Sequence, residues 1–252
     1  MKILFMNLGY ARGISGSLMH HIRYAHRHLY CVPSVQKQSL NLFSGLMREE
    51  KPDIACLVEI DRGSFGTAQF NQVEHLLDNI YFFSDIENKY AQNSLLRSFG
   101  PTAGKSNAFI ARKKYDFEKL SFACGVKRLV YKIKLDNELT LFFAHFSLNK
   151  TTRARQIIEA REQFRKTPGE VLFLGDFNVL SGLHEIEPIL ENGRRILLNR
   201  DSEPTFLFHK RKLVLDLGIS TPELAARTHL RVVPQTYSDH AALILDIHPR
   251  QI

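Results

Sequence analysis

Short apolar runs separated by turn residues recur along the whole chain. The runs are rich in β-branched and aromatic side chains and are bounded by Gly, Pro, Asn or Asp, which is typical of β-strands. Strands are predicted at residues 3–7, 54–59, 81–84, 107–111, 129–135, 139–145, 171–174, 213–219, 230–233 and 241–247. Helical periodicity predicts helices at residues 35–50, 70–79, 152–165 and 185–192.

The number and order of these elements indicate an α+β fold, with one domain over residues 1–252. Many strands and few helices, not in strict alternation, favour sheet packed on sheet with helices outside. No repeat, low-complexity tract or linker rich in Pro, Gly or Ser divides the chain. The first predicted helix carries an apolar stripe formed by Leu42, Phe43, Leu46 and Met47. Ser34 is the expected cap of this helix.

Residues 17–30 form a predicted amphipathic helix whose polar side carries several histidines and arginines. The favoured interpretation is a surface helix with a solvated basic face. An alternative is a contact for phosphates or for an anionic lipid surface. A zinc site made by His20, His21, His26 and His28 is disfavoured, because the spacing scatters these side chains around the helix.

A second segment, residues 86–106, is polar, contains glycine and has no clear periodicity. Connections of this length in a compact domain are usually functional or mobile. We therefore expect this segment to cover part of an active site.

Polar side chains stand at or near the ends of six predicted strands. The clearest case is the run Val171-Leu172-Phe173-Leu174-Gly175, which leads into Asp176 and Asn178. Since residues i and i+2 of a strand point to the same side, the carboxylate and the amide are expected to project together. A turn that caps a core strand is the simpler reading of this segment taken alone. The other strand ends carry Asn7, Glu59, His145, Asp216 and the pair Asp239-His240.

These residue types suit phosphoester chemistry. Carboxylate and amide oxygens such as those of Glu59, Asp239 and Asn7 suit Mg²⁺ or Mn²⁺ better than zinc. Two histidines, with a carboxylate beside one of them, suit acid–base chemistry near neutral pH. Asp61, two residues after Glu59, either shares the ligand role or begins a loop.

Composition adds a bias toward polyanionic partners. The formal net charge of +8 and a pI near 9.4 favour nucleic acid or an anionic membrane surface over other partners. No apolar segment approaches the roughly 20 residues that span a bilayer. The first residues read as a strand and not as a signal peptide. Three unevenly spaced cysteines indicate a reducing compartment, so a cytoplasmic location is expected.

The order of these residues resembles the endonuclease/exonuclease/phosphatase superfamily, whose members include deoxyribonucleases of the pancreatic type, sphingomyelinases and inositol-polyphosphate phosphatases. The resemblance rests on Asn7, Glu59, His145, the run Gly175-Asp176-Phe177-Asn178, Asp216 and Ser238-Asp239-His240, and it extends from the first strand to the last. It implies a four-layer αββα sandwich of the deoxyribonuclease I type, with the site at one end of two mainly antiparallel sheets.

The resemblance also implies a role for each residue. Glu59 is the main Mg²⁺ ligand, and Asn7 and Asp239 help to hold the metal or its waters. Asp176 orients or deprotonates the attacking water, and Asn178 donates to the phosphate. His145 and His240 act on the phosphoryl group. His145 stabilises the transition state, and His240 is polarised by Asp216.

The sequence is compatible with several functions. A Mg²⁺-dependent phosphodiesterase is favoured, and the charge favours a nuclease slightly. The alternatives are a lipid or headgroup hydrolase, similar to sphingomyelinases or inositol-phosphate phosphatases, and a non-catalytic protein that binds nucleic acid or membrane. No obligate protein partner is inferred. Residues 17–30 have no counterpart in the resemblance, so they leave the substrate open.

Overall fold

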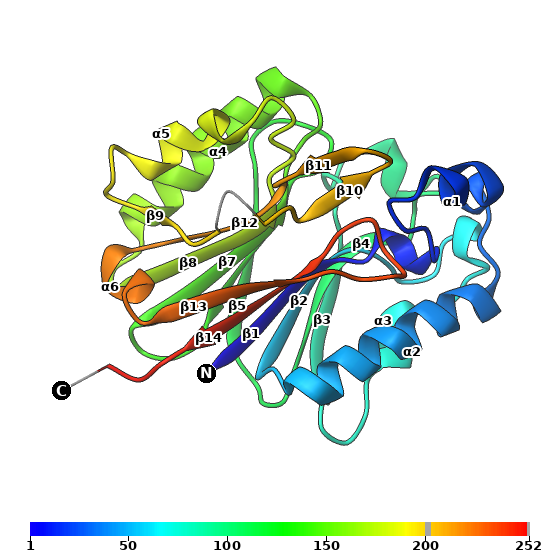
Figure 1. Ribbon diagram of the computed structural model, residues 1–252, viewed down its shortest axis with the longest axis horizontal. Coiled ribbons are helices and arrows are strands. Elements are labelled where there is room, and N and C mark those ends of the chain that lie inside the picture. The colour runs from blue at the N-terminus through cyan, green and yellow to red at the C-terminus, as the bar shows by residue number, and fades with distance from the viewer. Residues whose placement is uncertain (200–202, 251–252) are drawn as a thin grey trace.

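The computed structural model of the chain describes residues 1–199 and 203–250. Two six-stranded β-sheets lie face to face, and helices cover both outer faces (Figure 1). The layers are therefore helix, sheet, sheet and helix, with separate apolar cores between the two sheets and under each set of helices. The expected αββα sandwich is confirmed.

The first sheet contains the chain's first and last strands. Its order is β13-β14-β1-β2-β4-β3, with β1 and β2 parallel and the other neighbours antiparallel. The strands are β1 (Lys2–Asn7), β2 (Ile54–Asp61), β3 (Phe83–Asn88), β4 (Lys105–Ala111), β13 (Thr228–Val233) and β14 (Ala242–Ile247). Helices α2 (Pro33–Glu50) and α3 (Gln72–Leu76) pack on its outer face.

The second sheet has the order β5-β6-β7-β8-β12-β9, with β7 and β8 parallel. Its strands are β5 (Asp116–Ser121), β6 (Leu129–Lys134), β7 (Leu139–His145), β8 (Glu170–Asp176), β12 (Asp216–Ser220) and β9 (Ile196–Leu197). Helices α4 (Lys150–Lys166) and α5 (Glu187–Leu190) pack on its outer face. Two mixed sheets of this kind place the ends of β1, β2, β7 and β8 at one end of the sandwich (Figure 1).

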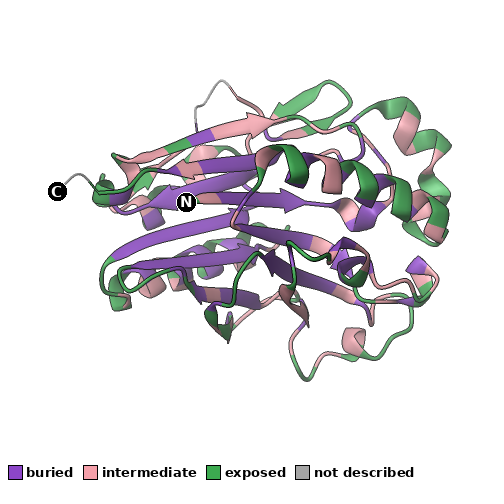
Figure 2. Cartoon of the chain, turned by 90° about the horizontal axis from the view of Figure 1, so that it is seen from below, coloured by how far each residue is buried: buried purple, intermediate pink, exposed green. Residues whose placement is uncertain are grey.

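Alternation along the central strands explains the uninterrupted apolar runs in the sequence. In β8, Leu172 and Leu174 point into the core between the sheets, whereas Val171 and Phe173 point toward α4. Both sets are fully buried, because each sheet is covered on both faces. Figure 2 shows this pattern, with buried strands inside and exposed helix surfaces outside.

Residues 17–30 do not form the single amphipathic helix that was predicted. They form α1 (Leu18–Arg23) and the 3₁₀ helix η2 (Ala25–His28), which meet at Tyr24, whose dihedral angles φ −110° and ψ 16° are not helical. The apolar side chains of Leu18, Ile22 and Leu29 remain exposed. An isolated short helix needs a packed face to persist, and this segment buries none of its residues.

Other differences concern element boundaries. Helix α2 begins at Pro33 with Val32 at its N-terminal cap, so Ser34 is not the cap. The predicted strand at 213–219 is two strands, because β11 (Arg211–Leu213) pairs with β10 (Phe206–Phe208) as a separate hairpin and β12 begins at Asp216.

Some short elements were missed or misplaced. Strands β5 and β9 were not predicted, and the strand expected at 81–84 lies at β3 instead. The helix expected at 185–192 is the 3₁₀ helix η5 (Leu183–Ile186) followed by α5. The short helix α6 (Pro222–Ala225) was also missed. Across the two described stretches, no helix combines the length and apolarity needed to cross a membrane.

Candidate active site

The polar strand ends of the two sheets meet at one end of the sandwich. Asn7, at the end of β1, donates from Nδ2 to Oδ2 of Asp176, at the end of β8, over 3.0 Å. Nε2 of His145, at the end of β7, lies 3.3 Å from the same Asp176 oxygen. All three side chains are at most 2% exposed. The structure thus brings together residues that are far apart in the sequence and belong to different sheets.

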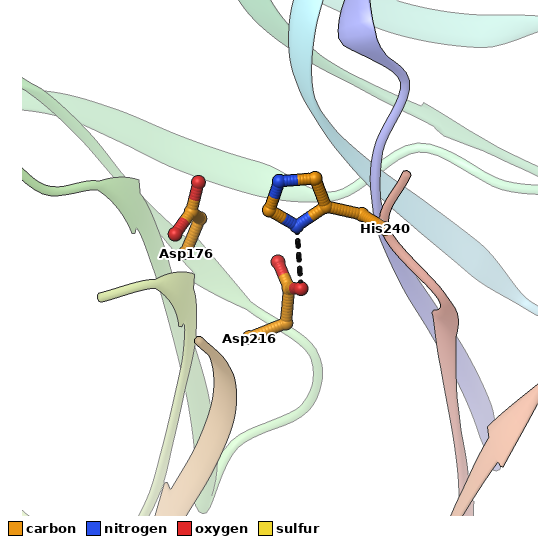
Figure 3. A group of neighbouring side chains, drawn as sticks. All are labelled: Asp176, Asp216 and His240. Carbon is orange, nitrogen blue, oxygen red and sulfur yellow. Dashed lines mark hydrogen bonds and ion pairs between the residues drawn. The ribbon is translucent and has the colours of Figure 1, made fainter. Parts of the chain in front are cut away.

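Asp216 and His240 form a second buried pair beside Asp176 (Figure 3). The distance from His240 Nδ1 to Asp216 Oδ2 is 2.7 Å. Burial alone would lower the pKa of His240, but the charge of Asp216 and this hydrogen bond raise it to about 10. Burial raises the pKa of Asp216 to about 6. The pair therefore holds a proton on His240 near neutral pH, and among the described residues the hydrogen bond of the ring is the one through Nδ1.

The cluster of Asp176, Asp216 and His240 is compact enough to be considered as a metal site. One ligand atom of each lies within 4.8 Å of the others. However, the Asp216–His240 hydrogen bond already engages two of the groups, and it suits acid–base chemistry better than ligation. Asp216 Oδ1 is buried and has no hydrogen-bond partner among the described residues.

The segment after β8 combines a strand end with a turn. Asn178 was expected to project together with Asp176, as alternate residues of a strand do, but it has φ +52° and lies outside β8. Its backbone N–H donates to Asp176 Oδ1 over 3.1 Å, which is an Asx turn. Its side-chain Nδ2 donates to the carbonyl oxygen of Phe146 over 3.1 Å. The turn fixes both side chains, and among the described residues the carbonyl oxygen of Phe146 is the one acceptor of the Asn178 amide group, which carries two N–H donors.

Glu59 lies in a β-bulge that directs it toward the second sheet. The register of β2 against β4 shifts between Leu57 and Ile60, and Glu59 has φ +53°. Its Oε1 is 3.7 Å from His145 Nδ1, across the gap between the sheets. Asp61 has a different task, because its carboxylate accepts hydrogen bonds from the backbone N–H groups of Gly63 and Ser64. Of the two readings of Asp61, the loop is the one that these contacts support.

Two lysines that the sequence did not single out contact Glu59. Lys89 Nζ donates to Glu59 Oε1 over 3.4 Å, and Lys127 Nζ lies 4.0 Å from the same oxygen. Burial by itself would raise the pKa of Glu59, but the positive charges around it hold that pKa well below the ordinary value. Burial and the two lysines lower the pKa of His145 well below its usual range, which favours the uncharged ring.

Glu59 and Asp239 line one small cavity of about 70 Å³. Oxygen ligands of this kind fit a hard divalent cation such as Mg²⁺. The contacts that Lys89, Lys127 and His145 make with Glu59 all involve its Oε1, and within residues 1–199 and 203–250 no group donates a hydrogen bond to Oε2. The residues present therefore fit a metal.

Asn7 is only partly available as a third ligand of such a metal. Its Oδ1 accepts the backbone N–H of Gly9 over 3.0 Å. An amide oxygen has two lone pairs, so one of them remains for a metal or for a metal-bound water. Its Nδ2 is already committed to Asp176.

The segment at residues 12–30 forms the opposite wall of this cavity. Arg12, His21 and His28 line it together with Glu59 and Asp239. An Arg12–His28 contact of 3.4 Å joins the two ends of the segment. The sequence signal for this wall was present as the run of histidines, but nothing in it showed which side would face the site.

The same segment is fixed to the β10–β11 hairpin. The His209 N–H donates to the carbonyl oxygen of Gly16 over 2.6 Å, and the rings of His21 and Phe208 lie 4.8 Å apart. The two segments approach so closely that a Cβ on Gly16 would lie 2.2 Å from the carbonyl oxygen of Leu207. The hairpin thus holds this wall of the cavity in place, and Figure 1 shows β10, β11 and α1 at the same end of the sandwich.

We expect Gly16→Ala to separate this wall from the hairpin, because the added methyl cannot fit against the Leu207 backbone. Hydrogen exchange of the His209 amide should become at least tenfold faster in this variant. Gly45→Ala is the matched control, because a Cβ on Gly45 in α2 meets nothing within 4 Å. Unchanged exchange at His209 in Gly16→Ala would show that the contact is not what protects this amide.

Comparison with known protein families agrees with the resemblance found in the sequence. A profile of the Endonuclease/Exonuclease/phosphatase family matches residues 35–240. No curated protein matches the sequence.

Many solved structures share the fold, and three of them illustrate its range. The mannosyl-6-phosphatase Bt3783 of Bacteroides thetaiotaomicron is 14% identical with a TM-score of 0.62, and the alignment covers 98% of this chain and 99% of that one. The human Nocturnin catalytic domain is 12% identical, with coverage of 98% and 94% and a TM-score of 0.66. D. rerio TDP2 in complex with single-strand DNA product is 14% identical, with coverage of 97% and 97% and a TM-score of 0.63. At these identities the likeness concerns the fold.

Proposed function

Because the chain belongs to the Endonuclease/Exonuclease/phosphatase family, we propose that it hydrolyses phosphoester bonds with the help of a divalent metal ion. The observation that carries the proposal is the gathering of His145, Asp176, Asp216 and His240 beside the cavity lined by Glu59 and Asp239. Acid–base groups and oxygen ligands for a metal at one place are what attack of water on phosphorus requires.

In this proposal, Asp176 orients the attacking water and takes its proton. Burial raises the pKa of Asp176 above its ordinary value, which makes its carboxylate a better base. As the bond from phosphorus to the leaving oxygen breaks, protonated His240 donates its Nε2 proton to that oxygen, while Asp216 holds the ring in place through Nδ1. The free N–H of Asn178 stabilises the phosphoryl oxygens, and His145 lines the same place with Nε2, 3.3 Å from Asp176. Mg²⁺ or Mn²⁺, held by Glu59 and Asp239 with help from Asn7, would neutralise charge on the phosphoryl group.

We propose a nucleic-acid strand as the substrate. The net charge of +8 supports this proposal, because a basic protein attracts a polyanion over a long range. The fold is shared with D. rerio TDP2, whose structure contains a single-strand DNA product. It is also shared with a mannosyl-6-phosphatase, so assays must include small phosphoesters.

An assay panel tests the reaction class. Plasmid DNA, RNA, sphingomyelin, phosphoinositides and bis(p-nitrophenyl) phosphate are incubated with the protein in Mg²⁺, in Mn²⁺ and in EDTA. We expect cleavage of nucleic acid and of bis(p-nitrophenyl) phosphate with metal and none in EDTA. Cleavage of lipid alone would replace the proposed substrate, and the absence of any turnover would contradict the proposed function.

Glu59→Gln tests the metal site. The substitution keeps the size of the side chain and removes the charge that would attract a divalent cation. We expect Mn²⁺ binding, followed by electron paramagnetic resonance, to weaken at least tenfold and hydrolysis to fall in parallel. Glu118→Gln on the exposed strand β5 is the control and should change neither. If Glu59→Gln binds Mn²⁺ as the wild-type protein does, Glu59 is not a ligand.

A further inference from the structure

Two lysines approach the site from different sheets. Lys89 directly follows β3 of the first sheet, and Lys127 precedes β6 of the second. The two segments are tied to each other, because the Arg128 N–H donates to the Lys89 carbonyl oxygen over 2.9 Å and Tyr90 pairs with Lys127 in a β-bridge. The backbone therefore fixes where both side chains begin.

Both ammonium groups are withdrawn from solvent. The side chain of Lys89 is 3% exposed and that of Lys127 is 17% exposed. Moving an ammonium group out of water costs several kcal/mol unless it gains charged or hydrogen-bonding partners. Lysines that contribute only to solubility lie on the surface. The burial of these two must therefore be explained by the groups that their ammonium groups contact.

Their partners supply too little negative charge. Glu59 is the one carboxylate within ion-pair distance of either lysine among the described residues. Lys89 is the closer of the two, at 3.4 Å against 4.0 Å for Lys127, and it also donates to the hydroxyl group of Tyr10. Glu59 is thus largely satisfied by Lys89, and the second ammonium lacks a carboxylate of its own.

The hydrogen-bond partner of Lys127 is the ring of His145, at Nε2. An ammonium group has three N–H donors. Within residues 1–199 and 203–250, the Lys127 ammonium group makes one hydrogen bond, which is to His145. Nε2 of His145 is also 3.3 Å from Asp176, the group proposed to handle the attacking water. The unused donors of Lys127 therefore lie beside the place where the phosphoryl group must sit.

We propose that Lys127 binds a non-bridging oxygen of the substrate phosphate and that Lys89 positions Glu59 so that Lys127 remains free to do so. This inference deepens the proposed function and rests on it. An ammonium group aimed at an oxygen on which negative charge grows stabilises the transition state more than the ground state. Lys127 is then a catalytic residue of this chain, and Lys89 is a positioning residue.

Inorganic phosphate is the probe for the binding step. Titration of the full-length protein with phosphate in EDTA, followed by calorimetry, measures the anion site without a metal. We expect Lys127→Met to weaken phosphate binding at least tenfold and Lys127→Arg, which keeps the charge, to stay within about threefold of wild type. Lys132→Met is the matched control, because Lys132 lies in β6 and its ammonium pairs with Glu118 away from the site.

Kinetics with bis(p-nitrophenyl) phosphate measure the catalytic step. Removing one donor to a developing oxyanion commonly lowers kcat by about 10²–10³, and we expect a fall of that size in Lys127→Met, with much of it restored in Lys127→Arg. For Lys89→Met we expect weaker Mn²⁺ binding, because Glu59 is no longer held. Lys132→Met should match the wild-type protein in both measurements.

A further measurement uses the wild-type protein and therefore does not depend on whether the variants fold. Phosphate should shift the side-chain ¹⁵N resonance of Lys127 and leave that of Lys132 in place. The proposal is overturned if the wild-type protein binds no phosphate at millimolar concentrations, if Lys127→Met binds it equally well, or if the Lys127 resonance does not respond.

The outcomes separate this inference from the proposed function. Hydrolysis of phosphoesters that is indifferent to Lys127 would leave the function standing and remove the lysine from it. Phosphate binding that depends on Lys127, in a protein that hydrolyses none of the panel, would leave an anion site and remove the proposed hydrolysis.

Discussion

His240→Ala is expected to lower kcat/KM for phosphoester hydrolysis by about 10²–10⁴, the usual range for a general acid or base. The residue sits where a proton donor to the phosphoryl group is needed, and its Nδ1 is held by Asp216 over 2.7 Å. Asp216→Asn should produce a smaller loss, because the asparagine still occupies the space but no longer stabilises the imidazolium ion.

The measurement is steady-state hydrolysis of bis(p-nitrophenyl) phosphate, with circular dichroism to verify the fold. His229→Ala is the control, since His229 is exposed on β13 and far from the strand ends that form the site. A folded His240→Ala protein with wild-type activity would mean that the reaction takes place elsewhere in the molecule.

Arg153→Met is expected to destabilise the protein by about 3–5 kcal/mol, the cost of breaking a buried ion pair by removing one partner. Arg153 is 1% exposed, although it begins on the surface helix α4. Its guanidinium group pairs with Glu185 over 2.5 Å and donates to the carbonyl oxygens of Ser147 and Leu148. These two carbonyls follow His145, so the arginine also anchors the loop that leaves the site.

Urea unfolding gives the free energy of unfolding for this comparison. Arg161→Met is the matched control on the same helix, because Arg161 pairs with Glu162 at the surface and such pairs contribute about 0–1 kcal/mol. An Arg153→Met protein that is as stable as Arg161→Met would show that the buried pair adds little to the fold.

The same pair predicts a pH dependence of stability. Burial would raise the pKa of Glu185, but hydrogen bonds from the Ser181 N–H and from Arg153 lower it below the ordinary value of 4.5. A carboxylate with a lowered pKa in the folded state adds stability that is present above pH 4.5 and is lost as the pH falls through the lower folded value. The stability difference between wild type and Arg153→Met should therefore shrink below pH 4.5.

Much of the fold could be predicted because its signals are local. Runs such as the one that leads to Asp176 are apolar on both faces, and only a sheet covered on both sides explains that pattern. The predictions failed where an element is short or where its apolar side finds no partner. Residues 17–30 have a helical period, yet they break at Tyr24, and the apolar side chains of Leu18, Ile22 and Leu29 remain exposed.

The candidate site was predictable in its acid–base and carboxylate groups. Burying a carboxylate or a histidine at the end of an apolar strand costs free energy unless the group has a hydrogen-bond or charge partner. Its presence at such a position therefore indicates a functional site. Lysine at the end of a strand carries little information, because it is common on exposed edges. Lys89 and Lys127 could therefore be identified as site residues only from their burial and their distance to Glu59.

By itself, the sequence determined the layers of the fold, the membership in a family and most of the side chains that could perform chemistry. Periodicity and strand ends depend on residues that are close in the sequence, so the sequence alone reveals them. The tertiary structure alone decided which of these side chains meet, that a bulge turns Glu59 toward His145, and that residues 12–30 wall the cavity. Contacts between two sheets depend on register and packing, and these are set by the whole molecule.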